Sequence, residues 1–304
     1  MKITKLDQMF EVLANQDKMR LVAAYANDSH TIEAVNAAVD KGIIDATLVG
    51  DEATIKAICK QEGIDVSKFV IVQESNDMKA AARAVELINS GEGEILMKGL
   101  VSTENYMRAI LNKEKGLMPP KAILSHVTVI ENPHYHKLLV VGDVAVMPAP
   151  ELHEKIAIAN YLIATSQALG TETPKVAIIG ASESVSPKIQ SSMDAAIITK
   201  MADRGQIKGA IVDGPLALDL AIDKESAEIK KITNPVAGDA DCLVFPNIEA
   251  GNVFYKTNTK LSTAKLAALV AGAKAPCILS SRGDSAQTKL YSIALSALIA
   301  KMKK

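Results

Sequence analysis

The sequence predicts an α/β protein built on mainly parallel sheets. Short apolar runs alternate along the chain with longer segments of helical periodicity. The runs are apolar on both faces, as strands are when helices cover both sides of a parallel sheet. Such strand–helix alternation is typical of α/β proteins. Several helical segments also end in a glycine, which readily adopts the left-handed conformation of a helix C-cap: Gly42, Gly63, Gly116, Gly170 and Gly205.

The expected strand and helix pairs follow one another in chain order. The first half of the chain contributes three pairs: 20–26 with 31–42, 46–50 with 51–63, and 94–99 with 103–116. The second half contributes three more: 174–182 with 186–205, 242–247 with one long helical segment ending at 275, and 277–281 with a last helix running to the chain end. Each pair supplies a strand and a covering helix to the predicted sheets.

The middle of the chain departs from this rhythm. Residues 122–132 and 136–150 are both strand-like, and only "PHYH" (133–136) joins them. No helix fits between the two runs, so we expect them to pair as antiparallel strands. This change in sheet character predicts that a second domain begins near "GLMPPK", residues 116–121.

Composition limits the classes of function. The 304 residues are 48% hydrophobic, which is enough for the cores of one large or two ordinary domains. A net charge of -1 gives no support for nucleic-acid or anionic-membrane binding. Three scattered cysteines indicate neither a disulfide framework nor a zinc site. The chain has no apolar run near the roughly 18 residues of a membrane span and no signal-peptide pattern, so we expect a cytoplasmic protein. We expect it to bind neither nucleic acid nor a membrane.

Common nucleotide, metal and hydrolase motifs are absent. The sequence has no G-x-x-x-x-G-K-[ST], no G-x-G-x-x-G after a strand, no H-E-x-x-H and no G-x-S-x-G. His134 and His136 alternate in the expected hairpin turn, where solvated surface residues are favoured over a metal site. We therefore expect no bound metal.

Polar residues follow the strand that opens "LMKGLVSTENYMRAIL", residues 96–111. Ligands of open α/β sheets gather at the carboxyl ends of the strands, and helix N-termini favour anions. In that interpretation Lys98, Thr103 and Arg108 surround a bound anion. The alternative is a capped helix with a surface ion pair between Glu104 and Arg108. The residues alone leave both interpretations open.

A second polar cluster, "VFPNIEAGNVFYK" (244–256), follows an expected buried strand. Glu249, Gly251 and Asn252 stand at the helix start, and Lys256 comes one turn later. A Pro-Asn turn with an ordinary helix cap explains the same pattern. The segment "VDGPLALD", residues 212–219, allows the same two interpretations, a ligand-binding cluster or an ordinary turn. Two such clusters at strand ends favour a shared cleft.

The stretch "CILSSRGDSAQTK", residues 277–289, joins a strand to the last expected helix. Gly283 permits a tight turn, and Ser285 or Asp284 can cap the helix. Arg282 needs another explanation, because a cation before a helix N-terminus is unfavourable unless an anion lies between them. A guanidinium binds phosphate through two hydrogen bonds, so this stretch predicts an oxyanion site. Arg-Gly-Asp also spells a cell-adhesion signal, which the composition opposes.

Together these stretches resemble the family of phosphate acetyltransferases and butyryltransferases. "PNIEAGNVFYK" and the strand-SRG-x-S turn are the most specific matches, and "DGPLALDLA" and "NPVAGDADCLVFP" also fit. "LMKGLVST", "SHVTVIE" and "TKLYSIALSA" are similar to the butyryl branch. The resemblance implies transfer of a short acyl group, butyryl or similar, between coenzyme A and inorganic phosphate, giving an acyl phosphate by direct attack in a ternary complex. Coenzyme A and phosphate are then substrates, and no permanently bound cofactor is expected.

The same resemblance implies a fold and an assembly. The fold is like that of the isocitrate and isopropylmalate dehydrogenases, with two α/β domains and the active site in the cleft between them. The chain leaves the first domain and returns to it at its end. This places residues 1–118 and 270–304 in one domain and 119–269 in the other. The family also implies a homodimer or a higher homo-oligomer.

The resemblance assigns roles to several residues. The family's catalytic serine matches Ser281, and its two phosphate-binding arginines match Arg282 and Arg108. A third arginine of the acetyl branch has no match, so Lys98 becomes the candidate for that charge. Ser125, in "SHVTVIE", joins the expected substrate-binding residues.

Two features keep other functions open. Thr288 stands where the acetyl branch has the aspartate proposed to take the thiol proton. Asp284 is the nearest carboxylate and becomes the candidate base; without a base the chain would bind coenzyme A and not turn it over. The same fold also carries metal- and NAD-dependent hydroxyacid dehydrogenases, which need an aspartate cluster at the cleft. The aspartates that could supply one are Asp213, Asp219, Asp239 and Asp241.

Overall fold

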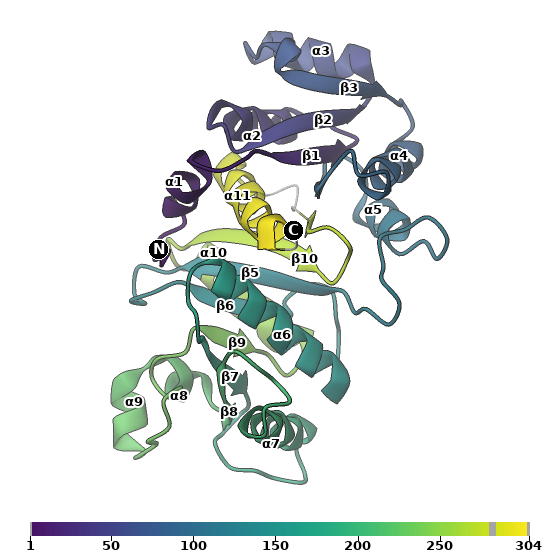
Figure 1. The fold of residues 1–304 in the computed structure, drawn as a ribbon. Helices are drawn as coiled ribbons and strands as arrows, with labels where there is room; N and C mark the ends of the chain where they lie inside the picture. The colour runs from purple at the N-terminus through teal and green to yellow at the C-terminus, as the bar shows by residue number, and fades with distance from the viewer. Residues whose placement is uncertain (1, 280–283, 303–304) are drawn as a thin grey trace. The chain divides into compact units, whose positions relative to one another are not determined.

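The computed structural model describes residues 2–279 and 284–302 and confirms the predicted α/β class (Figure 1). The chain divides into two compact units. We call residues 7–124 with 267–304 the terminal unit, and residues 1–6 with 125–266 the central unit. No helix within the described ranges is long and apolar enough to span a membrane.

The terminal unit has mainly parallel strands covered by helices. Its strands are β1 (Met19–Ala24), β2 (Ile44–Gly50), β3 (Phe69–Gln73), β4 (Ile95–Lys98), β10 (Lys265–Ala271, which enters this unit at its third residue) and β11 (Cys277–Ile278). Its helices are α1 (Gln8–Ala14), α2 (Ser29–Asp40), α3 (Glu52–Gln61), the short η1 (Val66–Lys68), α4 (Asp77–Asn89), α5 (Thr103–Ile110) and α11 (Ala286–Met302). The strands run in the order β3-β2-β1-β4-β11-β10; the β10–β11 pair is antiparallel and the others are parallel.

Local sequence explains the helix boundaries of this unit. Asp28, Asp51 and Asn76 precede α2, α3 and α4, and each side chain accepts a hydrogen bond from the backbone N–H three residues later. Gly42 and Gly63 follow α2 and α3 with φ of 69° and 66°, as predicted for C-caps. α11 packs against α1 and α2 and is buried along most of its length.

The central unit has a mixed arrangement of strands. These are β5 (Ser125–Glu131), β6 (Leu139–Gly142), β7 (Lys175–Ile179), β8 (Ile211–Leu216) and β9 (Cys242–Val244). Its helices are α6 (Leu152–Ala168), α7 (Gln190–Asp203), α8 (Leu218–Ile222), α9 (Lys224–Ile229) and α10 (Ile248–Lys260). The strands run in the order β5-β6-β9-β7-β8; the first pair is antiparallel and the others are parallel. The predicted antiparallel pair is therefore confirmed.

Two predicted elements were wrong. The segment expected to be one helix up to residue 275 contains α10 followed by β10, in which Val270 pairs with Cys277. The run "KLAALVA" consists of good helix formers, so only its pairing in the sheet makes it a strand. The helix expected over 103–116 ends at Ile110, and Gly116 lies in a later turn.

Candidate active site

Lys98 ends β4 at the carboxyl edge of the strands of the terminal unit. It is only 3% exposed, and its Nζ donates a hydrogen bond to the carbonyl oxygen of Gly99 at 3.2 Å. The N–H of Gly99 donates to the Ala24 carbonyl oxygen at 2.9 Å. A Cβ at Gly99 would come within 2.4 Å of the Tyr25 carbonyl oxygen, so the backbone approaches too closely for a side chain. This contact with the end of β1 fixes the buried ammonium at the edge where ligands of α/β sheets gather.

The first turn of α5 follows Lys98 after a short connection. Ser102 caps the helix by accepting a hydrogen bond from the N–H of Asn105 at 3.1 Å. Thr103 is exposed in the first turn. Arg108 lies in the last turn and pairs with Glu104; the two side chains are 63% and 77% exposed. An exposed pair of this kind contributes about 0.3–0.5 kcal/mol, so it holds the guanidinium only weakly.

A second strand ends beside β4. β11 is parallel to β4, with Cys277 opposite Leu96, so both strands reach the same edge of the sheet. The predicted catalytic residues Ser281 and Arg282 come three and four positions after Ile278 in the sequence and lie outside the described residues. β11 therefore ends beside β4, at the same edge of the sheet as Lys98.

The start of α11 shows which residue caps it. Ser285 Oγ accepts a hydrogen bond from the N–H of Thr288 at 3.1 Å, so Ser285 is the cap. Asp284, the candidate base, is half-buried just before it. Thr288 lies in the first turn, where its hydroxyl is 3.1 Å from Ser285 Oγ.

In the central unit, Asp143 organises the carboxyl edge of the strands. It follows β6 and is 2% exposed. Its Oδ2 accepts hydrogen bonds from Ser125 Oγ at 3.0 Å and the His126 N–H at 2.7 Å. Its Oδ1 accepts from the N–H groups of Ala145 at 2.7 Å and Val146 at 2.8 Å. Four donors compensate for burying this carboxylate, and the Ser125 hydroxyl is directed at it.

The signature helix α10 docks onto the same loop. A Cβ at Gly251 would lie 2.2 Å from the Asp143 carbonyl oxygen and 3.1 Å from the Phe245 ring. Asn252 donates from Nδ2 to the Val144 carbonyl oxygen at 3.1 Å. Gly251 and Asn252 therefore seat the helix on the loop after β6.

The remaining predicted residues of α10 face outward. Asn247 caps the helix by accepting from the N–H of Ala250 at 3.0 Å. Glu249 and Lys256 are exposed, and Lys256 Nζ lies 5.5 Å from the Tyr255 ring centroid. The structure thus places Lys98, Thr103, Arg108 and Asp284 in the terminal unit, and Ser125, Glu249, Gly251, Asn252 and Lys256 in the central unit.

A cavity of about 680 Å³ opens within the central unit. It lies between the N-terminal turns of α6 and α7 and the turn after β9. A buried ion pair lines it: Lys155 Nζ lies 2.6 Å from Asp194 Oδ2, and the two side chains are 5% and 2% exposed. Gln190 Nε2 donates to the other carboxylate oxygen at 2.7 Å.

Sequence reasoning missed this ion pair. Lys155 and Asp194 are 39 residues apart on different helices, with no recognisable spacing. A charged residue within a helical segment normally faces solvent. The one signal in the sequence was that apolar residues occur on every side of α6 and α7, which leaves neither helix a wholly polar face.

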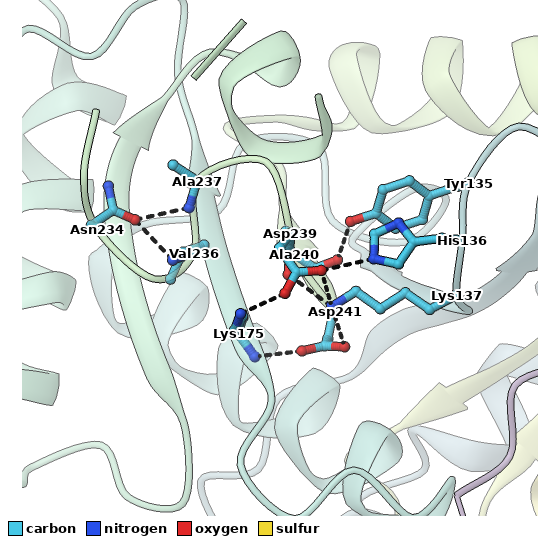
Figure 2. Close-up of polar contacts among 10 residues, drawn as sticks. All are labelled: Tyr135, His136, Lys137, Lys175, Asn234, Val236, Ala237, Asp239, Ala240 and Asp241. Atoms are coloured by element: carbon cyan, nitrogen blue, oxygen red, sulfur yellow. Dashed lines mark hydrogen bonds and ion pairs between the residues drawn. The ribbon is translucent and has the colours of Figure 1, made fainter. Parts of the chain in front are cut away.

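Asp239 and Asp241, two candidate metal ligands of the dehydrogenase alternative, lie at the amino ends of β7 and β9 (Figure 2). Asp239 contacts His136 at 2.8 Å and Lys137 at 2.9 Å through Oδ1, and Lys175 at 2.5 Å through Oδ2. Burial alone would raise the pKa of Asp239, but hydrogen bonds from Lys175, Lys137 and His136 lower it far below its usual range. This network ties the β5–β6 hairpin to the segment before β9.

The other two aspartates lie elsewhere in the unit. Asp213 is part of β8, where burial raises its pKa, and Asp219 is exposed in the first turn of α8. Among residues 2–279 and 284–302, no group of three His, Cys, Asp or Glu side chains could hold a metal ion. The aspartate cluster that the dehydrogenase alternative requires is therefore not formed by the described residues.

The fold is that of an α/β protein with polar side chains at the carboxyl ends of its strands, which is where proteins of this class commonly bind ligands. A branched-chain phosphotransacylase from Enterococcus faecalis V583 shares this fold, with a TM-score of 0.80, 31% identity, and 93% of this chain and 99% of that chain covered. A 4-hydroxythreonine-4-phosphate dehydrogenase from Klebsiella pneumoniae is similar in fold alone, with a TM-score of 0.56, 12% identity, and 93% of this chain and 99% of that chain covered.

Sequence comparison identifies the family. Residues 5–86 and 72–297 match the family described as phosphate acetyl/butaryl transferase. A phosphate butyryltransferase from Clostridium acetobutylicum is 46% identical over 98% of this chain and 99% of that protein. A phosphate acetyltransferase from Thermotoga maritima is 41% identical over 97% and 99%. The chain belongs to the phosphate acetyl/butyryl transferase family, which confirms the resemblance and the expected class of phosphate acyltransferase.

Proposed function

We propose that this protein transfers a short acyl group, butyryl or similar, between coenzyme A and inorganic phosphate. The observation that carries the proposal is the 46% identity to a phosphate butyryltransferase, which extends over 98% of this chain and 99% of that protein. Coenzyme A and phosphate are then substrates. The two products of the forward direction are acyl phosphate and free coenzyme A.

Phosphate binding is assigned to the carboxyl edge of the strands of the terminal unit. Lys98 supplies a buried ammonium at the end of β4. Arg282 follows the neighbouring strand β11, and Arg108 can leave its weak surface pair with Glu104 to reach an oxyanion. Guanidinium groups bind phosphate oxygens through paired hydrogen bonds, so the two arginines would orient the anion as well as neutralise it.

The chemistry is a direct displacement in a ternary complex. In the direction of thioester formation, the thiolate sulfur attacks the acyl carbonyl carbon, the carbon–oxygen bond to phosphate breaks, and phosphate leaves with the electron pair. A thiol with a pKa near ~8.5 is only a few per cent ionised at neutral pH, so a base is useful, and Asp284 is the candidate. Ser281 would donate a hydrogen bond to the carbonyl oxygen as charge develops on it; loss of such a donor raises a barrier by about 3–4 kcal/mol.

The test measures thiol release from butyryl-CoA in the presence of phosphate. Arg282→Ala and Arg108→Ala should each lower kcat/KM for phosphate by about 100- to 1,000-fold, the usual loss for one preorganised donor. Arg83→Ala is the matched control, because Arg83 is also an exposed helical arginine in an ion pair, with Glu86 at 2.6 Å, and should behave as the native protein. Full activity of both test variants would show that phosphate binds elsewhere.

A second assay addresses the acyl group and the unmatched base. Rates with acetyl-, butyryl- and isobutyryl-CoA define the acyl preference. The three substrates must be compared directly, because one methylene group changes selectivity by only about 1–3 kcal/mol. Thr288 in place of the expected aspartate favours one other candidate, a coenzyme A-binding protein without turnover. Calorimetric binding of coenzyme A with no thiol release from any of the three thioesters would establish that candidate instead.

A further inference from the structure

The buried Lys155–Asp194 ion pair lines the cavity of the central unit, and we call this pair the floor of the cavity. It has N–H donors beyond the one that joins the two side chains. The Lys155 ammonium carries three N–H donors. Among the described residues, Asp194 Oδ2 accepts one of them at 2.6 Å. The side chain is only 5% exposed, so bulk water does not surround the other donors. A buried ammonium is stable only when its donors are satisfied, which makes this floor a place for an acceptor group.

The rest of the lining defines the chemistry of that acceptor. The Lys155–Asp194 pair is neutral overall, so the floor favours a neutral carbonyl oxygen over an anion, which Asp194 would repel. Pro150, Ile197 and Pro246 supply apolar walls, while Gln190 and Ser191 add polar groups. A volume of about 680 Å³ is in the range of small-molecule sites. The lining fits a flexible aliphatic chain that carries amide groups.

We infer that this cavity binds the pantetheine arm of the acyl-CoA substrate. The inference rests on the proposed function and assigns one part of its substrate. The arm has two amides separated by methylene groups, which match the ammonium and amide donors and the apolar walls. The turn at Pro246 lines the cavity and leads directly into α10 at the carboxyl edge of the strands of the central unit, where ligands of such sheets bind.

Ile197→Trp tests the assignment by filling the cavity from an exposed wall. Ile197 is 40% exposed, so the larger ring can be accommodated without repacking the core. KM for butyryl-CoA should rise about tenfold, which corresponds to about 1.4 kcal/mol, while KM for phosphate stays unchanged. Ile211→Trp is the matched control: Ile211 is 37% exposed on β8 and is not part of the cavity lining, so both KM values should remain native.

Truncated thioesters locate the part of the substrate that the cavity holds. Butyryl-pantetheine keeps the whole arm and lacks the nucleotide, whereas butyryl-N-acetylcysteamine keeps only the amide next to the sulfur. Ile197→Trp should lower kcat/KM about tenfold for butyryl-CoA and butyryl-pantetheine and leave butyryl-N-acetylcysteamine unchanged. Loss with butyryl-CoA alone would assign the cavity to the nucleotide. Equal loss with all three thioesters, or no loss, would also overturn the inference.

A second variant tests the floor itself. Lys155→Met combined with Asp194→Leu removes the donors without leaving a buried charge unpaired. It should raise KM for butyryl-pantetheine and spare KM for phosphate; an unchanged KM for butyryl-pantetheine would contradict the inference. Failure of the proposed function would look different, because the native protein would then release no thiol from butyryl-CoA and phosphate.

Discussion

Replacing Gly251 by alanine tests how tightly the signature helix α10 must sit on the loop after β6. Gly251 is the fourth residue of α10 and is buried against the backbone of Asp143. An added Cβ would lie 2.2 Å from the Asp143 carbonyl oxygen and 3.1 Å from the Phe245 ring. The first contact is with backbone, which cannot turn away as a flexible side chain can.

The size of the effect follows from two opposing terms. Carbon–oxygen contacts are normally about 3.3–3.6 Å, so the new methyl group overlaps Asp143 by about 1 Å and α10 must move outward. Overpacking of this kind costs about 1–3 kcal/mol. Alanine stabilises a helix by up to about 1 kcal/mol relative to glycine. Because the 2.2 Å contact is with backbone, the upper part of the overpacking range, about 2–3 kcal/mol, applies. Subtracting about 1 kcal/mol for helix propensity, we expect Gly251→Ala to lower the local stability of α10 by about 1–2 kcal/mol.

Native-state hydrogen exchange is the appropriate assay, because a chain with two compact units need not unfold in one step. The free energy of opening is measured for the amides of α10. Val253→Ala is the control on the same helix: Val253 is 66% exposed, so the change improves helix propensity without a clash. If α10 in the Gly251→Ala variant is as stable as in the native protein, or more stable, the steric argument is refuted.

Two further predictions concern carboxylates of the central unit. Asp143→Asn turns one acceptor oxygen into a donor, so at least one buried N–H, such as that of His126, loses its partner. The free energy of opening that native-state hydrogen exchange measures for the amides of β5 and β6 at about pH 7 should fall by about 1–3 kcal/mol. Unaltered protection of these amides would contradict the four-donor assignment. The folded pKa of Asp239 is depressed below the unfolded value of about 3.9, so its stabilising contribution is complete above that value and is lost as the pH falls below it. In the native protein the free energy of unfolding should fall between about pH 6 and pH 3, and in the Asp239→Asn variant this fall should be smaller. A variant that loses as much stability as the native protein over this range would show that Asp239 is not the group responsible.

Local sequence patterns predicted much of the fold. The alternation of apolar runs and helical segments indicated the parallel strands, and four predicted C-cap glycines, Gly42, Gly63, Gly170 and Gly205, have positive φ. Such features depend on neighbouring residues, whose conformational preferences act over a few positions. The motifs around α10 and β11 likewise indicated the family from short segments.

Errors occurred where a local pattern had two solutions. "KLAALVA" suits a helix or a buried strand, and it is a strand because Val270 pairs with Cys277 across the sheet. Gly116 has the sequence context of a helix cap, yet α5 ends at Ile110. Pairing between distant segments is absent from local propensity, so the sequence could not decide either case.

The fold class, the helix caps and the family follow from the amino-acid sequence alone, because each depends on residues close together in the chain. Which side chains meet is a property of the tertiary structure. It directs Ser125 at Asp143, seats Gly251 against that residue's backbone, and buries Lys155 against Asp194 beside a cavity. The Ser125–Asp143 and Lys155–Asp194 contacts join residues 18 and 39 positions apart in the chain. Their energies depend on burial and close packing, which exist only once the strands and helices have assembled.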